Sequence, residues 1–247
     1  MTRKTRIDKL LFEKGMAPSR ERARAYIMAG NVLVEEQKID KPGTMIPHGA
    51  TIRLKNPDQP YVSRGGLKLE KALKEFKIDV RHQIALDIGA STGGFTDCLL
   101  QNGAAFVFSV DVGYGQLAWK LAQNPKVQSL EKQNFRHLPF DQIGTFVDLI
   151  VIDVSFISLT KILKNCLSFL TKKGKILALV KPQFEAGKAN IKKGGLVTDH
   201  HTHEEVIQSV KQYAEEIGLN AIGTITSPIE GKKSGNKEFL IYLKGND

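Results

Sequence analysis

The sequence predicts an α/β protein: a doubly wound sheet preceded by a small N-terminal α+β module. Three observations support this fold class. After about residue 61, apolar runs typical of strands alternate with helical patterns. The first apolar run leads into a glycine-rich turn, and acidic residues follow several of these runs, as at the ligand-binding edge of a parallel sheet. Residues 1 to 58 show a different pattern, with two short helices and short alternating strands.

The N-terminal module is predicted to span residues 1–58. Apolar residues at helical spacing predict a first helix from Ile7, and Ser19 can cap a second helix that ends at Gly30. Residues 31–35 and 51–54 alternate like short strands. The module therefore contains both helices and strands.

A turn-rich segment at residues 55–60, with two prolines, is the strongest boundary signal in the chain. We therefore expect a linker at residues 59–66 and a second domain at residues 67–247. Gly65 and Gly66 suggest that this linker includes an adjustable hinge.

The chain is strongly basic, with 36 Lys and Arg against 26 Asp and Glu and a net charge of +10. Such an excess favours a polyanionic partner such as nucleic acid. Counting along the chain, residues 1–60 hold half of that excess, twelve basic against seven acidic residues. The N-terminal module is therefore expected to provide the electrostatic attraction to that partner, although a charged helix face that contacts only solvent gives the same pattern.

Basic residues near the two expected helix starts can bind phosphate. The pattern from Arg6 through Ser19–Arg20 to Lys41–Pro42 resembles the RNA-binding domain named after ribosomal protein S-four. Arg64 lies at the junction of the modules, within reach of RNA from either side. The RNA-binding candidates are Arg3, Lys4, Arg6, Arg20, Arg22, Lys41 and Arg64.

In the second domain, strands are expected at residues 84–86, 106–110, 127–130, 149–152, 176–180 and 239–243. Asp87, Asp111 and Asp153 each follow one of these strands, which places them at the carboxyl edge of the sheet, where such folds bind ligands.

The turn from Asp87 to Thr96 is predicted to bind a nucleotide-like cofactor. Its glycines let main-chain N–H groups at a helix start approach a ligand closely. The spacing lacks the second glycine of G-x-G-x-x-G, which disfavours a pyrophosphate. The turn together with Asp111 looks instead like the S-adenosylmethionine site of Rossmann-like methyltransferases, with Asp111 holding the ribose hydroxyls.

Five blocks in order resemble the TlyA family, also labelled hemolysin A-like. They are residues 61–69, 87–96, 153–159, 181–185 and 235–239. The resemblance covers the whole chain and implies an S-four domain joined to an FtsJ-type RNA ribose 2′-O-methyltransferase domain. The catalytic Lys-Asp-Lys-Glu set of that type maps onto Lys68, Asp153, Lys181 and Glu238. The implied cofactor residues are Asp87, Gly89, Ala90, Ser91, Gly93, Gly94, Phe95, Asp111, Asn134, Phe135 and Asp153.

The chemistry of ribose methylation explains why these residue types are needed. A 2′-hydroxyl is a weak acid and a poor nucleophile, so it must be aligned with the methyl donor and lose its proton. Two lysines in one pocket lower each other's pKa, so one can approach neutrality while the other stabilises negative charge. We assign activation of the hydroxyl to Lys181, with Lys68 and Glu238 positioning it and Asp153 orienting it beside the methyl donor.

Other features exclude alternatives. Only two cysteines occur, which fits a reducing cytoplasm, and the N-terminus has no signal-peptide pattern. No apolar run is long enough to span a membrane. His200, His201 and His203 lie near acidic residues but lack the H-E-x-x-H spacing, so we expect no metal site.

The resemblance implies methylation of cytidines in large-subunit ribosomal RNA and, for members with this N-terminal start, in small-subunit RNA as well. Two alternatives stay open: a cytolysin, as the hemolysin label suggests, and a ribosome-binding factor without catalytic activity.

Overall fold

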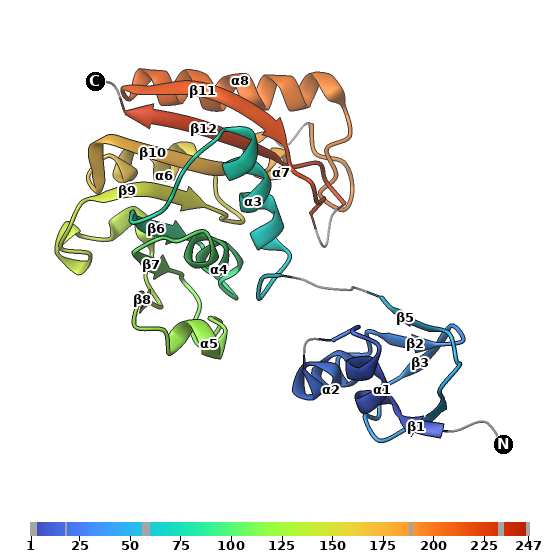
Figure 1. Cartoon of the computed structure of the whole chain (residues 1–247). Helices are drawn as coiled ribbons and strands as arrows, with labels where there is room; N and C mark the ends of the chain where they lie inside the picture. Colours follow the sequence, from blue (N-terminus) through green and yellow to red (C-terminus); the bar gives the residue numbers. More distant parts are fainter. Residues whose placement is uncertain (1–3, 18, 56–59, 188–189, 232–234, 246–247) are drawn as a thin grey trace. The chain divides into compact units, whose positions relative to one another are not determined.

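The computed structural model describes residues 4–17, 19–55, 60–187, 190–231 and 235–245 (Figure 1). The chain forms two compact units, Met1–Gln59 and Pro60–Asp247.

The first unit is an α+β module with its own small core. Two helices, α1 (Ile7–Glu13) and α2 (Arg20–Met28), pack together. The strand β2 (Val32–Val34) pairs with β3 (Gln37–Ile39) and β5 (Ile52–Leu54), while β1 (Lys4–Arg6) pairs with β4 (Met45–Pro47). The Ser19 side chain accepts the Arg22 N–H and so caps α2, as the sequence predicts. Ile7, Leu10, Leu11 and Ile27 have no exposed surface, so apolar residues of both helices form the core.

The second unit contains a seven-stranded sheet in the order β11-β12-β10-β9-β6-β7-β8. The strands are β6 (Ile84–Ile88), β7 (Phe106–Val110), β8 (Val127–Leu130), β9 (Val147–Ile152), β10 (Leu170–Val180), β11 (Leu219–Thr226) and β12 (Phe239–Gly245). The strands from β8 to β10 are parallel, and β12 is antiparallel to both of its neighbours. The predicted doubly wound α/β fold is confirmed.

Helices cover both faces of this sheet (Figure 1). They are α3 (Gly65–Glu75), α4 (Gly94–Gln101), α5 (Trp119–Ala122), α6 (Thr160–Cys166), α7 (Pro182–Glu185) and α8 (His200–Glu216), with short 3-10 turns η1 (Phe135–His137) and η2 (Phe140–Gln142). Successive residues of β9 point to opposite faces. Leu149 and Val151 pack in the core with α3 and α4, while Ile150 and Ile152 pack in the core with α6 and α8.

The order of strands creates the ligand-binding edge. From the central strand β6, the chain proceeds to β7 on one side, and β9 lies on the other. The loops after β6 and β9 lead to helices on opposite faces of the sheet, α4 and α6, and so leave a crevice at the carboxyl ends of the strands.

The segment of the expected linker that the structure describes lies against the second unit. Tyr61 is buried, and the Val62 N–H donates to Asp97 Oδ2 (2.8 Å). The glycines that suggested a hinge instead open α3, and a side chain at Gly66 would collide with the ring of Tyr61.

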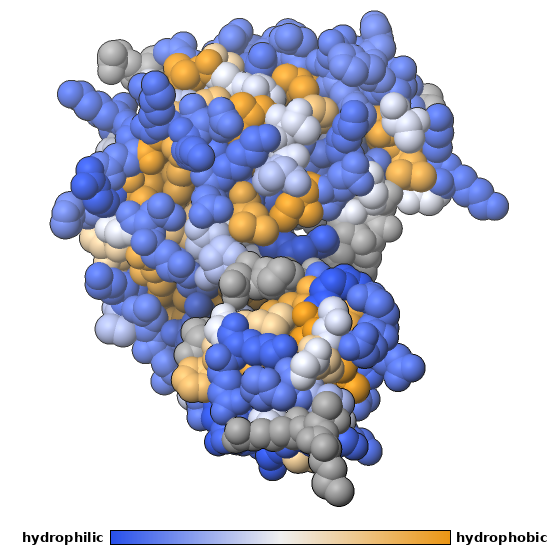
Figure 2. Space-filling model, turned by 45° about the vertical axis from the view of Figure 1, so that its right-hand side comes forward, coloured by the Kyte–Doolittle hydropathy of each residue, from blue (hydrophilic) through white to orange (hydrophobic). Residues whose placement is uncertain are grey.

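Figure 2 shows polar and charged side chains over most of one face, with apolar groups scattered among them. No helix within the described ranges is long and apolar enough to cross a membrane.

Candidate active site

A cavity of about 680 Å³ lies at the carboxyl ends of β6, β9 and β10. Its walls come from the turn after β6, the loop after β9, the start of α7 and the start of α3, with further residues near positions 194–195 and 229–231. Segments far apart in the sequence thus meet at the edge that the strand pattern predicts.

The four residues of the predicted catalytic set form one chain of contacts in this cavity. Lys68 Nζ lies 2.6 Å from Glu238 Oε2 and 3.7 Å from Asp153 Oδ2. Lys181 Nζ lies 2.6 Å from the other oxygen of Asp153, Oδ1. The carboxylate of Asp153 therefore bridges two ammonium groups, and positive and negative groups alternate along the chain.

These four side chains are largely removed from water. Their side-chain exposures are 11% for Lys68, 22% for Asp153, 9% for Lys181 and 4% for Glu238. Low exposure strengthens electrostatic interactions, because water screens them less. The four residues come from different segments of the chain, and the fold brings them together.

The ammonium of Lys181 has a second partner that sequence reasoning missed. It donates a hydrogen bond to Ser155 Oγ (3.0 Å), two residues after Asp153. Asp153 and Ser155 thus hold the same ammonium from one loop. The position of Ser155 inside the block that contains Asp153 was the signal that could have identified it.

Asp87 is the penultimate residue of β6, which runs one residue past it to Ile88, and its carboxyl is fully buried. Its Oδ2 accepts hydrogen bonds from the backbone N–H (2.9 Å) and the hydroxyl (2.6 Å) of Thr96. Its Oδ1 is buried and has no hydrogen-bond partner among the described residues. Burial raises the pKa of Asp87 to about 7. Because this carboxyl also lines the cavity, Oδ1 is available to a donor group of a bound ligand.

The glycine turn lies close to neighbouring backbone. Gly89 has a φ of +82°, and a Cβ there would come within 2.6 Å of the carbonyl oxygen of Asp153. Gly93 has a φ of +94° and caps α4. A side chain at Gly94 would meet the Gly66 N atom at 2.9 Å. Glycine at these positions keeps the turn open beside the cavity, where Ala90, Ser91 and Phe95 also line the wall.

Asp111 follows β7 and organises the same turn. Its Oδ2 accepts the Ser91 N–H (2.8 Å) and its Oδ1 accepts the Gly113 N–H (2.7 Å). Each carboxylate oxygen retains a lone pair for a further donor. Asp111 itself is not among the residues that line the cavity, although its partner Ser91 is.

Asn134 and Phe135 do not line this cavity. Asn134 Oδ1 accepts the Arg136 N–H and caps η1, and Phe135 is buried with its ring centroid 5.4 Å from that of Phe169. The structure therefore gives Phe135 a packing role. The adenine contact expected of Asn134 stays a prediction.

In the N-terminal unit, Asp8 joins two of the predicted RNA-binding residues. Its carboxylate is 1% exposed and accepts from Arg6 at 3.0 Å and from Arg20 at 3.4 Å. The Arg6 guanidinium holds the pKa of Asp8 below its usual value. Both arginine side chains are about half exposed, at 49% and 51%, so Asp8 fixes them while leaving donors free for a phosphate.

The other RNA-binding candidates are exposed. Lys4 lies in β1, Lys41 precedes Pro42, whose carbonyl accepts the Asp8 N–H, and the Arg22 guanidinium lies 5.1 Å from the centre of the Tyr26 ring. Arg64 lies in the second unit and lines the cavity. Arg3 lies outside the described residues.

The cavity contains further groups that the sequence did not reveal. Phe156 is 89% exposed, has a φ of +65° and lies with its ring centroid 5.1 Å from that of Phe184. Gln183 Oε1 is buried without a hydrogen-bond partner in the described chain. Residues near 194 and 230 contribute because strand order places them there, which no local pattern indicates.

The histidines near residue 200 have structural roles. His203 is buried, and its Nε2 lies 2.8 Å from the Val197 carbonyl oxygen. His200 and His201 pair with Glu204 and Glu205 one helical turn away. No group of three metal-ligating side chains occurs in the part of the chain that the structure describes.

Fold and cavity together define an S-adenosylmethionine-dependent methyltransferase. The residues present fit this cofactor, since Oδ1 of Asp87 is a buried acceptor that no described residue partners, and Gly89 leaves no room for a side chain. The pattern of FtsJ-like methyltransferases matches residues 61–245, and that of the S4 domain matches residues 5–52.

Two relatives extend over nearly the whole chain. YqxC of Bacillus subtilis, provisionally named an rRNA methyltransferase, is 47% identical over 98% of this chain and 86% of its own length. The 16S/23S rRNA (cytidine-2′-O)-methyltransferase TlyA of Mycobacterium tuberculosis is 41% identical over 99% of this chain and 91% of its own length. The chain belongs to the FtsJ-like methyltransferase family, within its TlyA branch.

A solved structure is similar to the whole chain. A Streptococcus thermophilus protein provisionally named a hemolysin is 46% identical, with a TM-score of 0.77 over 100% of this chain and 90% of its own.

Proposed function

We propose that this enzyme transfers a methyl group from S-adenosylmethionine to the ribose 2′-hydroxyl of cytidines in ribosomal RNA. The observation that carries the proposal is the alternating chain Glu238–Lys68–Asp153–Lys181, which lines the same cavity as the cofactor turn. Two ammonium groups held by carboxylates suit a reaction in which a neutral hydroxyl becomes a nucleophile. The M. tuberculosis relative, a 16S/23S rRNA (cytidine-2′-O)-methyltransferase, supports the same substrate.

S-adenosylmethionine supplies an electrophilic methyl group, so the reaction needs no metal. Asp87 and the glycine turn hold the cofactor, together with Ala90, Ser91, Phe95 and Asp111. Asp153 lies at the junction, because its backbone carbonyl touches the turn and its carboxylate faces the lysines.

Lys181 acts on the ribose. Asp153 Oδ1 and Ser155 Oγ fix its ammonium in position, so the nitrogen needs little reorganisation when a ribose hydroxyl approaches. As a neutral amine Lys181 accepts the hydroxyl proton and becomes an ammonium, or as an ammonium from the start it stabilises the forming alkoxide. Lys68, held by Glu238 at 2.6 Å, supports the second oxygen of Asp153 and so keeps that carboxylate oriented.

The N-terminal module, residues 1–58, docks the enzyme on RNA, and residues 67–247 perform the chemistry. Arg6 and Arg20, fixed by Asp8, present guanidinium groups to the phosphate backbone, with Lys4, Lys41 and Arg22 nearby in the chain. We propose large-subunit RNA as the main substrate and small-subunit RNA as a second one. We also propose a cytoplasmic location, where such subunits are made.

Methyl transfer to purified subunits tests the proposal. Large and small ribosomal subunits from cells that lack the protein are incubated with enzyme and tritiated cofactor, and the modified nucleotides are mapped. We expect 2′-O-methylcytidine in the large subunit. Subunits from cells that have the protein are the control, since their sites are already filled. Label on a base rather than on ribose would refute the proposal, and leakage of liposomes by the same protein would favour a cytolysin.

A further inference from the structure

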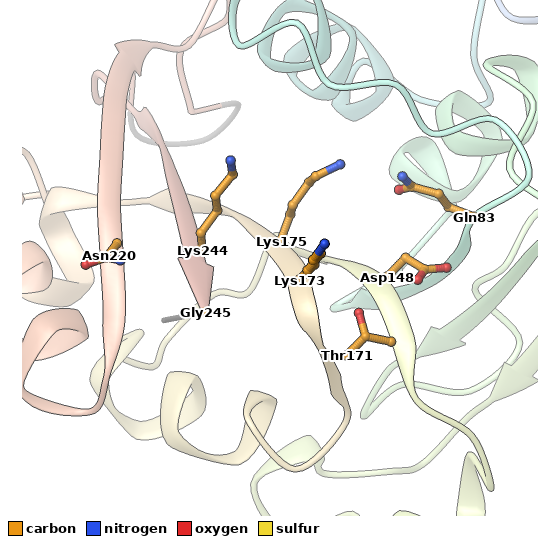
Figure 3. A pocket seen from close by; sticks show the side chains of 8 residues that line it. All are labelled: Gln83, Asp148, Thr171, Lys173, Lys175, Asn220, Lys244 and Gly245. Atoms are coloured by element: carbon orange, nitrogen blue, oxygen red, sulfur yellow. The ribbon is translucent and has the colours of Figure 1, made fainter. Parts of the chain in front are cut away.

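A second cavity lies at the opposite edge of the large sheet from the active site. It has a volume of about 470 Å³ and is lined by residues near the amino ends of β6 and β9 and by parts of β10, β11 and β12. Three of the lining residues are Lys173, Lys175 and Lys244. We call this cavity the lysine cleft (Figure 3).

The sheet register forces two of these charges together. Lys175 of β10 lies directly opposite Lys244 of β12 in the antiparallel pair. Like charges at directly opposed positions repel each other and destabilise the pair. Figure 3 shows the two side chains rising from adjacent strands in the same direction. The arrangement is unfavourable unless an anion lies between or above the two ammonium groups.

Within the described chain, the cleft holds three lysines against a single carboxylate, so the protein does not balance their charge. Among the described residues, none of the three ammonium groups forms a hydrogen bond or ion pair, and Lys244 Nζ has only the Tyr242 ring at 5.8 Å. Asp148 is the one acidic residue that lines the cleft in the described chain, and its Oδ2 already accepts the Ile84 N–H at 3.0 Å.

The cleft is also lined by a neutral side chain, the amide of Gln83. Gln83 Oε1 is buried and has no hydrogen-bond partner in the part of the chain that is described. In Figure 3 its amide faces the lysines across the opening. A half-turn about the last side-chain bond replaces this oxygen by the NH₂ donor, so the amide can also serve an acceptor in the cleft.

We propose that the lysine cleft binds the phosphate backbone of the substrate RNA. The ligand is a phosphodiester, because the cleft presents three cations and an amide and is larger than a single phosphate needs. RNA is favoured over a free anion because residues 61–247 remain basic when the N-terminal module is excluded, with 24 Lys and Arg against 19 Asp and Glu.

The lysine cleft and the active site are close enough for a single RNA molecule to contact both. Lys175 and Lys181 lie six residues apart on or next to β10, which corresponds to roughly 20 Å along a strand. The cleft therefore gives the catalytic unit an anchor of its own, remote from the reacting ribose. This inference rests on the proposed function, since it assumes that RNA is the substrate.

The test uses the full-length protein with Lys175→Gln and Lys244→Gln combined. The matched control is Lys126→Gln with Lys211→Gln, which removes the same charge at positions outside both cavities. Binding to purified large ribosomal subunits is measured from low to high salt. We expect the cleft variant to bind roughly five- to tenfold more weakly near 0.1 M salt, with a log–log salt slope shallower by about 0.7 to 0.9 for each lost phosphate contact.

Other measurements separate the outcomes. Affinity for S-adenosylmethionine should be unchanged in both variants, which shows that the active site is intact. Equal subunit binding by the cleft and control variants would overturn the inference. Stabilisation of the original protein, but not of the cleft variant, by inorganic phosphate together with unchanged subunit binding would assign the cleft to a small anion and also overturn it. If the original protein binds subunits through the cleft yet methylates no ribose, the proposed function fails and the cleft stands.

Discussion

Replacing Lys181 by alanine removes the group to which we assign activation of the 2′-hydroxyl. Its ammonium is held at 2.6 Å by Asp153 and at 3.0 Å by Ser155, and only 9% of the side chain is exposed. No other described residue places a cation on Oδ1 of Asp153, since Lys68 faces Oδ2. The alanine variant therefore has no nearby replacement for the missing group.

The expected loss follows from the role. A positioned general base contributes about a hundredfold to ten-thousandfold to a rate. This range corresponds to roughly 3 to 5 kcal/mol of barrier. The variant also loses some stability, because Asp153 is left with one partner at 3.7 Å. Since that partner remains, we expect less than the roughly 3 to 5 kcal/mol that follows when a buried charge loses every partner.

Single-turnover transfer of tritiated methyl from cofactor to subunits measures the chemical step. Ser155→Ala is the matched control, because it keeps the ammonium and removes one hydrogen bond worth about 1 kcal/mol, or roughly fivefold in rate. Lys181→Arg should not restore activity, because a guanidinium stays protonated and cannot accept the proton. Thermal melting shows whether each variant is folded at the assay temperature. A folded Lys181→Ala variant that transfers methyl within tenfold of the original rate would refute the assignment.

Three further predictions concern cofactor binding, stability and docking. Asp111→Ala should weaken S-adenosylmethionine binding about tenfold or more, since a charge-assisted hydrogen bond contributes roughly 1.5 to 3 kcal/mol; unchanged affinity by calorimetry would contradict the ribose contact. Burial raises the pKa of Asp87 from 3.8 to about 7, so the folded protein holds this proton more tightly than the unfolded chain, and the contribution of Asp87 to stability falls as pH rises between those values. Asp87→Asn should therefore gain stability over the original protein by up to about 1.4 kcal/mol per pH unit in that window. The same difference in free energy of unfolding between the two proteins at pH 5 and at pH 7 would count against this. Removal of residues 1–58 should leave a folded protein that binds cofactor, because each unit has its own core, but methylation of subunits should be lost; a truncated enzyme as fast as the full chain would disprove the docking role.

The sheet was largely predictable because its central strands are buried on both faces. Continuous apolar runs such as residues 176–180 indicate such strands regardless of context. The sequence did not indicate β11, an edge strand in which polar and glycine residues interrupt the apolar ones. It also missed β1 (Lys-Thr-Arg), β3 (Gln-Lys-Ile) and β4 (Met-Ile-Pro), because polar residues or a proline leave these segments without an apolar strand pattern, whereas the equally short β2 (Val-Leu-Val) keeps one.

The site was predictable where a residue ends a strand. Asp87, Asp153 and Lys181 could be placed from local sequence, because parallel strands end at a common edge. Lys68 could not, since it lies on α3 and reaches Glu238 only through tertiary packing, 170 positions along the chain. Phe135 shows the opposite case, in which a residue next to the expected cofactor edge is used for the core.

The close approach of Gly89 to Asp153 has a consequence for how this enzyme can change. The Asp153 N–H donates to the Ile88 carbonyl at 3.0 Å, and its own carbonyl leaves no space for a side chain on Gly89. The cofactor turn and the loop whose Asp153 contacts both lysines are therefore expected to move together. A substitution that shifts the turn also moves the carboxylate between the lysines, so cofactor affinity and turnover cannot be adjusted independently at this contact. Directed evolution toward a bulkier methyl donor would therefore have to widen the pocket at another part of its wall.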